Sequence, residues 1–382
     1  EATGIPVGTS QAGVGSLNWD HPQCLGAVGA TGTTAANRLA READVIIGIG
    51  TRYSDFTTSS RTAFQNPKVR FININIASFD AFKHGSAFPV VADARETIIE
   101  LTNELRSYTV DKEYESKISS EKRHWDALVD ASFIDQELTL PSQTEIIHAV
   151  QSASDPTDTV ICAAGSLPGD LHKLWRVRDP LGYHMEYAFS CMGYEIAAGL
   201  GVARADSSRT PVVMMGDGSY LMMHTELVTA VAEGLKFIVV LVQNHGYASI
   251  GHLSEDIGSQ RFGTQYRFKD QAGNNFENGA KLPVDLAANA ASLGINVIDI
   301  KPSTSAISDL HEAVKTAKKS ATSTLIHINS DPLLYAPGGE AWWEVPIPEV
   351  STLESTKKAY ENYKEARKVQ KKYLGKGAIE RR

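Results

Sequence analysis

The chain has 382 residues and 42% apolar content, enough for two domains that each bury a core. There are 37 Lys and Arg against 45 Asp and Glu, and the net charge of −8 disfavours a polyanionic partner such as nucleic acid. No apolar run is long enough to span a membrane, and three cysteines without CxxC or metal-ligand spacing favour a reduced, cytoplasmic setting.

The first region has the pattern of an α/β domain, which we expect over residues 1–106. Apolar runs at residues 44–50 and 71–76 predict strands, and an alanine-rich stretch at 33–41 predicts a short helix. Residues 107–140 are charged and poor in glycine, which is typical of a helical linker.

A glycine-rich segment in this region has the spacing GxxGxxG, at Gly26, Gly29 and Gly32. A dinucleotide-binding turn would follow a strand and would have a different spacing. We expect no strand before this segment, so the pattern argues against NAD binding.

A second α/β unit is expected over residues 141–335. It is predicted to contain a helix at 144–151, a strand at 159–163 and a last strand at 323–329. The remaining residues, 336–382, are expected to form a C-terminal helical tail, which is basic and carries aromatic residues at roughly helical spacing over residues 354–382. Acidic residues interleave with the basic ones, which favours a solvated docking helix over a nucleic-acid site.

Two polar turns in the second unit predict a metal site. Apolar strands end at Gly216-Asp217-Gly218 and at Asn244, with Gly246 close behind. A right-handed βαβ crossover places such turns side by side, and carboxylate, amide and carbonyl oxygens suit magnesium. The glycines and a helix starting near Ser219 would accommodate a diphosphate. The alternative is an ordinary Asp-Gly turn in a Rossmann-like sheet.

The combination of Gly216-Asp217-Gly218 with Asn244 resembles the diphosphate-binding signature of thiamine diphosphate (ThDP) enzymes. The chain departs from the family at Gln243, where most relatives carry another Asn. The first region resembles a partial Rossmann-like middle domain of these enzymes. Its opening strand and helix are missing, so we expect the chain to start partway through that domain.

Four segments sharpen the resemblance, namely residues 183–201, 216–227, 262–267 and 341–344. They are similar to the 3D-(3,5/4)-trihydroxycyclohexane-1,2-dione hydrolases of myo-inositol catabolism. This resemblance implies a homo-oligomeric, ThDP- and magnesium-dependent hydrolase that opens the cyclic dione to 5-deoxy-glucuronate by C–C cleavage. An acetolactate synthase-like carboligase and a non-catalytic cofactor-binding fragment remain alternatives.

The resemblance also implies roles for individual residues. Asp217, Asn244 and the carbonyl of Gly246 match the metal ligands. Met192 matches the apolar wedge that bends the cofactor, against the alternative of a core methionine on a helix. The residues expected to contact the cofactor are Gly165, Ser166, Met192, Gly216, Gly218 and Ser219.

No catalytic residue is assigned in this chain. In the family, the glutamate that activates the pyrimidine lies in an N-terminal pyrimidine-binding domain, which we expect in the full-length protein. His184, His245 and Arg267 are weak candidates for proton transfer or substrate contact. Packing explains the histidines equally well, and a surface ion pair explains Arg267. His224 is expected to pack rather than react.

Overall fold

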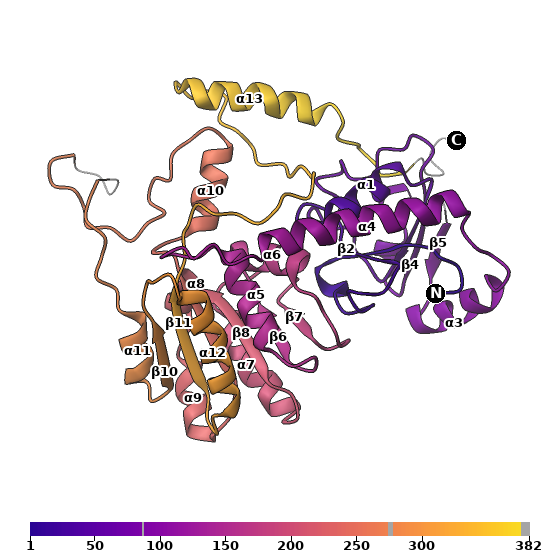
Figure 1. The fold of residues 1–382 in the computed structure, drawn as a ribbon. Helices are drawn as coiled ribbons and strands as arrows, with labels where there is room; N and C mark the ends of the chain where they lie inside the picture. Colours follow the sequence, from indigo (N-terminus) through magenta and orange to yellow (C-terminus); the bar gives the residue numbers. More distant parts are fainter. Residues whose placement is uncertain (86–87, 274–277, 376–382) are drawn as a thin grey trace.

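Within the described residues, 1–85, 88–273 and 278–375, the computed structural model contains three parallel β-sheets with helices around them (Figure 1). The predicted α/β fold with a parallel sheet flanked by helices is therefore confirmed. In the second region, for example, the helix predicted at residues 144–151 is observed at Gln143–Ala153, and the strand predicted at 159–163 is observed at Thr159–Cys162. None of the described helices is long and apolar enough to cross a membrane.

The first region holds two of the sheets. One pairs β1 with β2, and the other has the order β3-β4-β5. The strands at residues 44–50 and 71–76 are confirmed as β3 and β4, and the alanine-rich helix as α1. The elements are β1 (Val7–Thr9), η1 (Gln11–Gly13), β2 (Cys24–Ala27), α1 (Thr34–Glu42), β3 (Val45–Ile49), β4 (Arg70–Asn75), α2 (Ser78–Ala81), η2 (Lys83–Gly85), β5 (Phe88–Val91) and α3 (Ala94–Glu104).

One expectation for this region is wrong. A strand does lead into the glycine-rich segment, because β2 contains Gly26 and precedes Gly29. The turn is nevertheless filled by the protein itself. A Cβ at Gly29 would lie 2.1 Å from the carbonyl oxygen of Phe56, so the glycine allows close packing of residues 56 and 57 against it.

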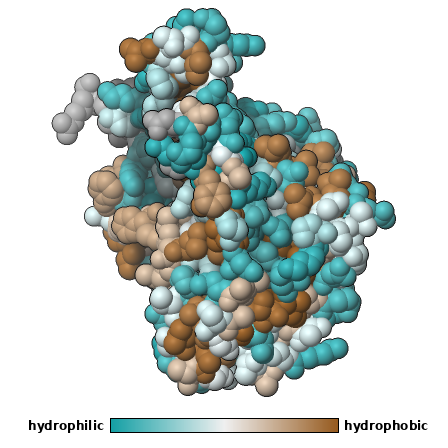
Figure 2. Space-filling model, turned by 90° about the vertical axis from the view of Figure 1, so that its left-hand side faces the viewer, coloured by the Kyte–Doolittle hydropathy of each residue, from teal (hydrophilic) through white to brown (hydrophobic). Residues whose placement is uncertain are grey.

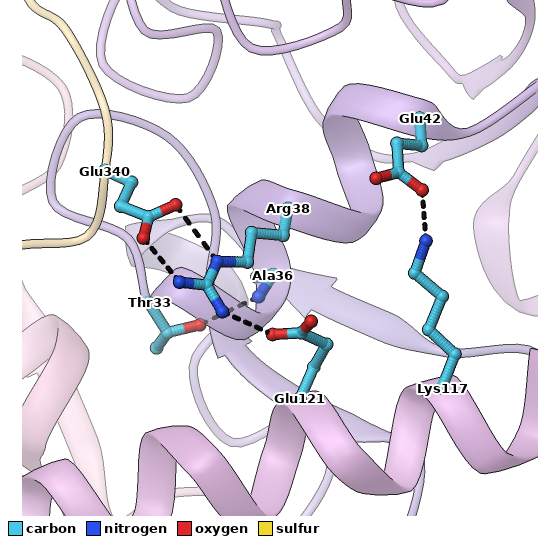
Figure 3. A network of polar contacts seen from close by, with 7 residues as sticks. All are labelled: Thr33, Ala36, Arg38, Glu42, Lys117, Glu121 and Glu340. Carbon is cyan, nitrogen blue, oxygen red and sulfur yellow. Dashed lines mark hydrogen bonds and ion pairs between the residues drawn. The ribbon is translucent and has the colours of Figure 1, made fainter.

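The long helix α4 (Lys112–Ser132) runs between the two regions and packs against α1 (Figure 1). Arg38 on α1 ties three segments together (Figure 3). Its guanidinium donates to Glu121 on α4 at 3.0 Å and to Glu340 at 2.5 and 3.0 Å. Lys117 on α4 forms an ion pair with Glu42 at the end of α1. These ion pairs lie at the edge of a contact that buried residues such as Leu39 and Ile118 also form.

A six-stranded parallel sheet with the order β10-β11-β9-β8-β6-β7 forms the second region. The strand at residues 323–329 is confirmed as β11, but it lies inside the sheet between β10 and β9. The short strands β7 and β10 were not predicted. The elements are α5 (Gln143–Ala153), β6 (Thr159–Cys162), α6 (Ser166–Leu174), β7 (Tyr183–Met185), α7 (Tyr194–Ala205), β8 (Pro211–Gly216), α8 (Asp217–Met222), α9 (Glu226–Glu233), β9 (Ile238–Gln243), α10 (Ala248–Asp256), α11 (Leu286–Ser292), β10 (Asn296–Ile300), α12 (Ala306–Lys319) and β11 (Thr324–Asn329).

Both faces of this sheet are covered. Strand β9 is buried along its whole length, which explains its unbroken apolar sequence. One core lies between the sheet and helices that include α5 and α12, and another lies against α7, α9 and α11. On the side that carries β10 and α11, hydrophobic residues form several groups separated by hydrophilic ones (Figure 2).

The C-terminal segment returns to the first region. Helix α13 (Glu354–Arg367) begins beside α10, where Ser355 and Thr356 both donate to the carbonyl of Gly258. Farther along, Leu374 is 1% exposed and joins the core cluster that contains Phe71. Residues 376–382 of the expected C-terminal tail lie outside the described residues.

Candidate functional site

The two polar turns meet at the carboxyl ends of β8 and β9. These strands are neighbours in register, with Gly216 opposite Val242. Asp217 is the first residue of α8, two positions earlier than the helix start expected from the sequence. Its side chain is fully buried and accepts hydrogen bonds from the N–H of Gly218 at 3.0 Å and of Gly246 at 3.1 Å. The Asp217 carboxylate therefore joins both turns.

The second turn offers the oxygens that a cation would need. Asn244 Oδ1 is buried and has no hydrogen-bond partner among the described residues, which is unusual for a buried amide oxygen. Gly246 lies against a neighbouring segment, since a Cβ there would be 2.1 Å from the Thr264 carbonyl oxygen. No group of three or more His, Cys, Asp or Glu that could hold a metal occurs in the described part of the chain. The candidate set instead combines one carboxylate, one amide and one carbonyl.

Burial dominates the electrostatics of this turn. It raises the pKa of Asp217 from 3.8 to about 7, although four backbone N–H groups of the two turns oppose the shift. A cation beside the carboxylate would compensate the desolvation of its charge. The buried carboxylate and the unpartnered Asn244 oxygen thus fit a divalent metal.

Met192 lies next to this turn and not on a helix. It precedes Gly193, the N-cap of α7, and it is half-buried. Its methyl group lies beside Gly218, where an added Cβ would be 3.1 Å from Met192 Cε and 2.8 Å from the Tyr247 ring. The glycine thus leaves room for Met192 and Tyr247 to form an apolar wall beside the turn at Asp217.

A third turn, at Gly165 and Ser166, follows β6, which pairs with β8. Gly165 has φ +91° and caps α6, with open space where a Cβ would be. Ser166 Oγ donates to Gln143 at 3.0 Å, and Ser190 Oγ donates to the carbonyl of Ala163 at 2.8 Å. The segment that leads to Met192 therefore lies on this turn.

The three weak catalytic candidates, His184, His245 and Arg267, each contact other groups of the protein. His184 Nε2 lies 2.7 Å from the Tyr194 hydroxyl, and burial lowers the pKa of His184. His245 Nδ1 lies 3.2 Å from Gln243 Nε2, and burial also lowers its pKa. Arg267 donates to Gln265 at 2.6 Å and to the Gly279 carbonyl at 2.8 Å, so it braces its own loop. His224 stacks on Tyr220, in agreement with the packing role expected for it.

Sequence reasoning missed two residues of this site, the buried Glu195 and the half-buried Tyr266. Glu195 is fully buried at the start of α7. Its Oε2 accepts from Gly193 N–H, while Oε1 has no partner in the described residues, and burial raises its pKa. The ring of Tyr266 packs edge-on against Tyr247, and its hydroxyl is buried without a described partner. An acid in the first turn of a helix is common, so the sequence carried no distinctive signal for Glu195.

Comparison with known proteins agrees with this geometry. Residues 1–101 match the family described as "Thiamine pyrophosphate enzyme, central domain", and residues 163–328 match "Thiamine pyrophosphate enzyme, C-terminal TPP binding domain". The second match contains all three turns, from Gly165 to Gly246.

Curated relatives cover nearly the whole chain. It is 40% identical over 386 residues to "3D-(3,5/4)-trihydroxycyclohexane-1,2-dione hydrolase 2" from a strain of Bacillus cereus, covering 95% of this chain. It is 39% identical over 94% of its length to the hydrolases of that name from strains of Bacillus anthracis and Bacillus thuringiensis. The chain spans 59% of the length of the first relative and 58% of the others. On these matches and on the geometry of its turns, the chain belongs to the thiamine diphosphate enzyme family.

Proposed function

We propose that the chain binds ThDP together with magnesium at the three turns. Asp217, Asn244 and the Gly246 carbonyl would ligate the metal, and Gly165, Ser166, Gly216, Gly218 and Ser219 would contact the diphosphate. The unpartnered Asn244 oxygen beside a buried carboxylate is the observation that carries this proposal. We also propose domain limits of 1–106, 107–140, 141–335 and 336–382.

The reaction proposed for the full-length protein is hydrolytic C–C ring opening of 3D-(3,5/4)-trihydroxycyclohexane-1,2-dione to 5-deoxy-glucuronate. Bound ThDP supplies a nucleophilic carbon and an electron sink for cleavage of the bond between two carbonyl carbons. The chain's own residues would bind and orient it, with Met192 and Tyr247 as the apolar wall at Gly218. The similarity to hydrolases of that name supports this substrate over pyruvate.

The N-terminal pyrimidine-binding domain of the full-length protein, in a homo-oligomer, is the partner we propose for this site. Large apolar side chains on the segments that flank the metal turn are exposed, as a docking partner would require. They are Phe189, Leu221, Met222 and Met223, at 86%, 42%, 55% and 51% exposure. A chain that matches little more than half the length of its relatives is consistent with such a partner.

Calorimetric titration of ThDP, with and without magnesium, tests the cofactor site. Asp217→Ala should weaken ThDP binding in magnesium at least tenfold, since a lost contact to a charged group is worth about 1.5–3 kcal/mol. Asp309→Ala, which removes an exposed carboxylate on α12, is the matched control. Equal affinity of the wild type and Asp217→Ala would refute the metal assignment.

Product analysis with the full-length protein tests the substrate. We expect ring opening of the dione and little acetolactate from pyruvate, because polar groups that bind a polyhydroxylated ring are left unpaired by pyruvate. Efficient carboligation without ring opening would instead favour an acetolactate synthase-like enzyme. Full turnover by residues 1–382 alone would contradict the need for the partner domain.

A further inference from the structure

A series of linked polar side chains, buried at its centre, runs across three adjacent strands and ends at the proposed metal site. It starts at Asp299 on β10, whose Oδ1 lies 2.8 Å from His327 Nδ1 on β11. His327 Nε2 lies 2.6 Å from Gln243 Oε1 at the end of β9. Gln243 Nε2 then lies 3.2 Å from His245 Nδ1. Gln243 and His327 are only 2% and 7% exposed.

His245, the last residue of this series, has a backbone conformation that non-glycine residues rarely adopt. His245 has φ +60°, in the left-handed region. It stands between Asn244 and Gly246, two of the ligands proposed above. Such a conformation persists only where the surroundings hold it, and the ring of His245 is held by Gln243.

We propose that Asp299, His327 and Gln243 are positioning residues that keep His245 left-handed and so set the Asn244 and Gly246 oxygens for the metal. This inference rests on the proposed function. The Gln243 amide has both a donor and an acceptor, so it links the two rings in either orientation when one facing ring nitrogen carries a proton and the other does not. Gln243, the departure from the family pattern, thereby gains a role.

Mn²⁺ binding to the ThDP-loaded protein, measured by electron paramagnetic resonance, tests the proposal. His327→Leu should weaken Mn²⁺ binding roughly tenfold, the scale of one unsupported left-handed residue. Glycine adopts this conformation freely, so His245→Gly should make the metal site insensitive to His327→Leu. Asp299→Asn keeps an acceptor for His327 and should bind Mn²⁺ better than Asp299→Ala. The control is His148→Leu, because His148 stacks on Phe133 and takes no part in the series of hydrogen bonds from Asp299 to His245.

The outcomes distinguish a failure of the positioning role from a failure of the proposed metal and cofactor site. If folded His327→Leu binds Mn²⁺ like the wild type, the positioning role is wrong. It is also wrong if His245→Gly fails to suppress the defect, because the loss of Mn²⁺ binding then does not pass through the backbone of His245. If His327→Leu does not fold, Mn²⁺ binding by Asp299→Asn and Asp299→Ala tests the positioning role instead. Equal binding by these two variants would then contradict it. Wild-type protein that binds no Mn²⁺ with ThDP overturns the proposed function and this inference with it.

Discussion

Acidification should destabilise the protein through His172, a buried histidine on α6. Its Nδ1 lies 2.9 Å from Thr31 Oγ1 and its Nε2 lies 3.3 Å from the Thr9 carbonyl oxygen, so it joins the second region to the first. Burial lowers its pKa from 6.5 to about 4, against the opposing effect of hydrogen bonds with the Thr9 and Ser10 backbone. The neutral ring suits this site because it offers one donor and one acceptor.

The sign and size of the effect follow from proton linkage. Well above pH 6.5 neither state binds the proton, and protonation of His172 does not contribute to the free energy of unfolding. As the pH falls from 6.5 to about 4, His172 becomes protonated in the unfolded chain but stays neutral in the folded protein, so the free energy of unfolding decreases. At 1.36 kcal/mol per pKa unit the loss reaches about 3 kcal/mol in full, and about 2 kcal/mol at about pH 5.

Urea unfolding near neutral pH and at about pH 5 measures this loss. His172→Gln keeps a donor and an acceptor but does not titrate, so it should lose about 2 kcal/mol less than the wild type over this interval. His311→Gln, which replaces a histidine on the surface of α12 beside Glu312, should behave like the wild type. An equal loss in the wild type and in His172→Gln would refute the reasoning.

Two further predictions concern packing and reactivity. Leu374→Ala should lower the free energy of unfolding by about 2–5 kcal/mol, because the side chain is 1% exposed, whereas Val369→Ala, at 53% exposure, should change it little; equal effects in denaturant titration would contradict this. Alkylation of the native protein should modify Cys191 before Cys24 or Cys162, because Cys191 is exposed and burial raises the pKa of Cys162 to about 12; mass spectrometry of digested protein would show the order, and uniform labelling would argue against it.

The meeting of the turns at Asp217 and Asn244, where we propose the metal site, could be anticipated because the information in the sequence is local. Strands β8 and β9 are unbroken apolar runs, and Asp217 and Asn244 stand directly at their ends. The rule for parallel crossovers then brings the two turns together without further knowledge. Met192 was located by the family resemblance, and the structure adds that it sits in a turn against Gly218.

Other features depend on contacts that a single sequence does not reveal. Strand β2 has four residues, one of them a glycine with φ +77°, so neither length nor composition marked it as a strand. Glu195 looks like an ordinary acid in the first turn of a helix until its burial is known. Likewise, the sequence alone does not show that Asp299 and His327 lie near Gln243, because this depends on β10 and β11 pairing beside β9.

The position of Leu374 affects how the molecule is made. The residues around Phe71 leave the ribosome early, but the core they build includes a side chain synthesised about 300 residues later. Until Leu374 is synthesised, the core around Phe71 is incomplete and leaves apolar surface exposed. Such exposed surface favours chaperone binding or misassembly. The last stretch of the chain works as a closing step, and the rate of folding of the first region should depend on when that stretch arrives.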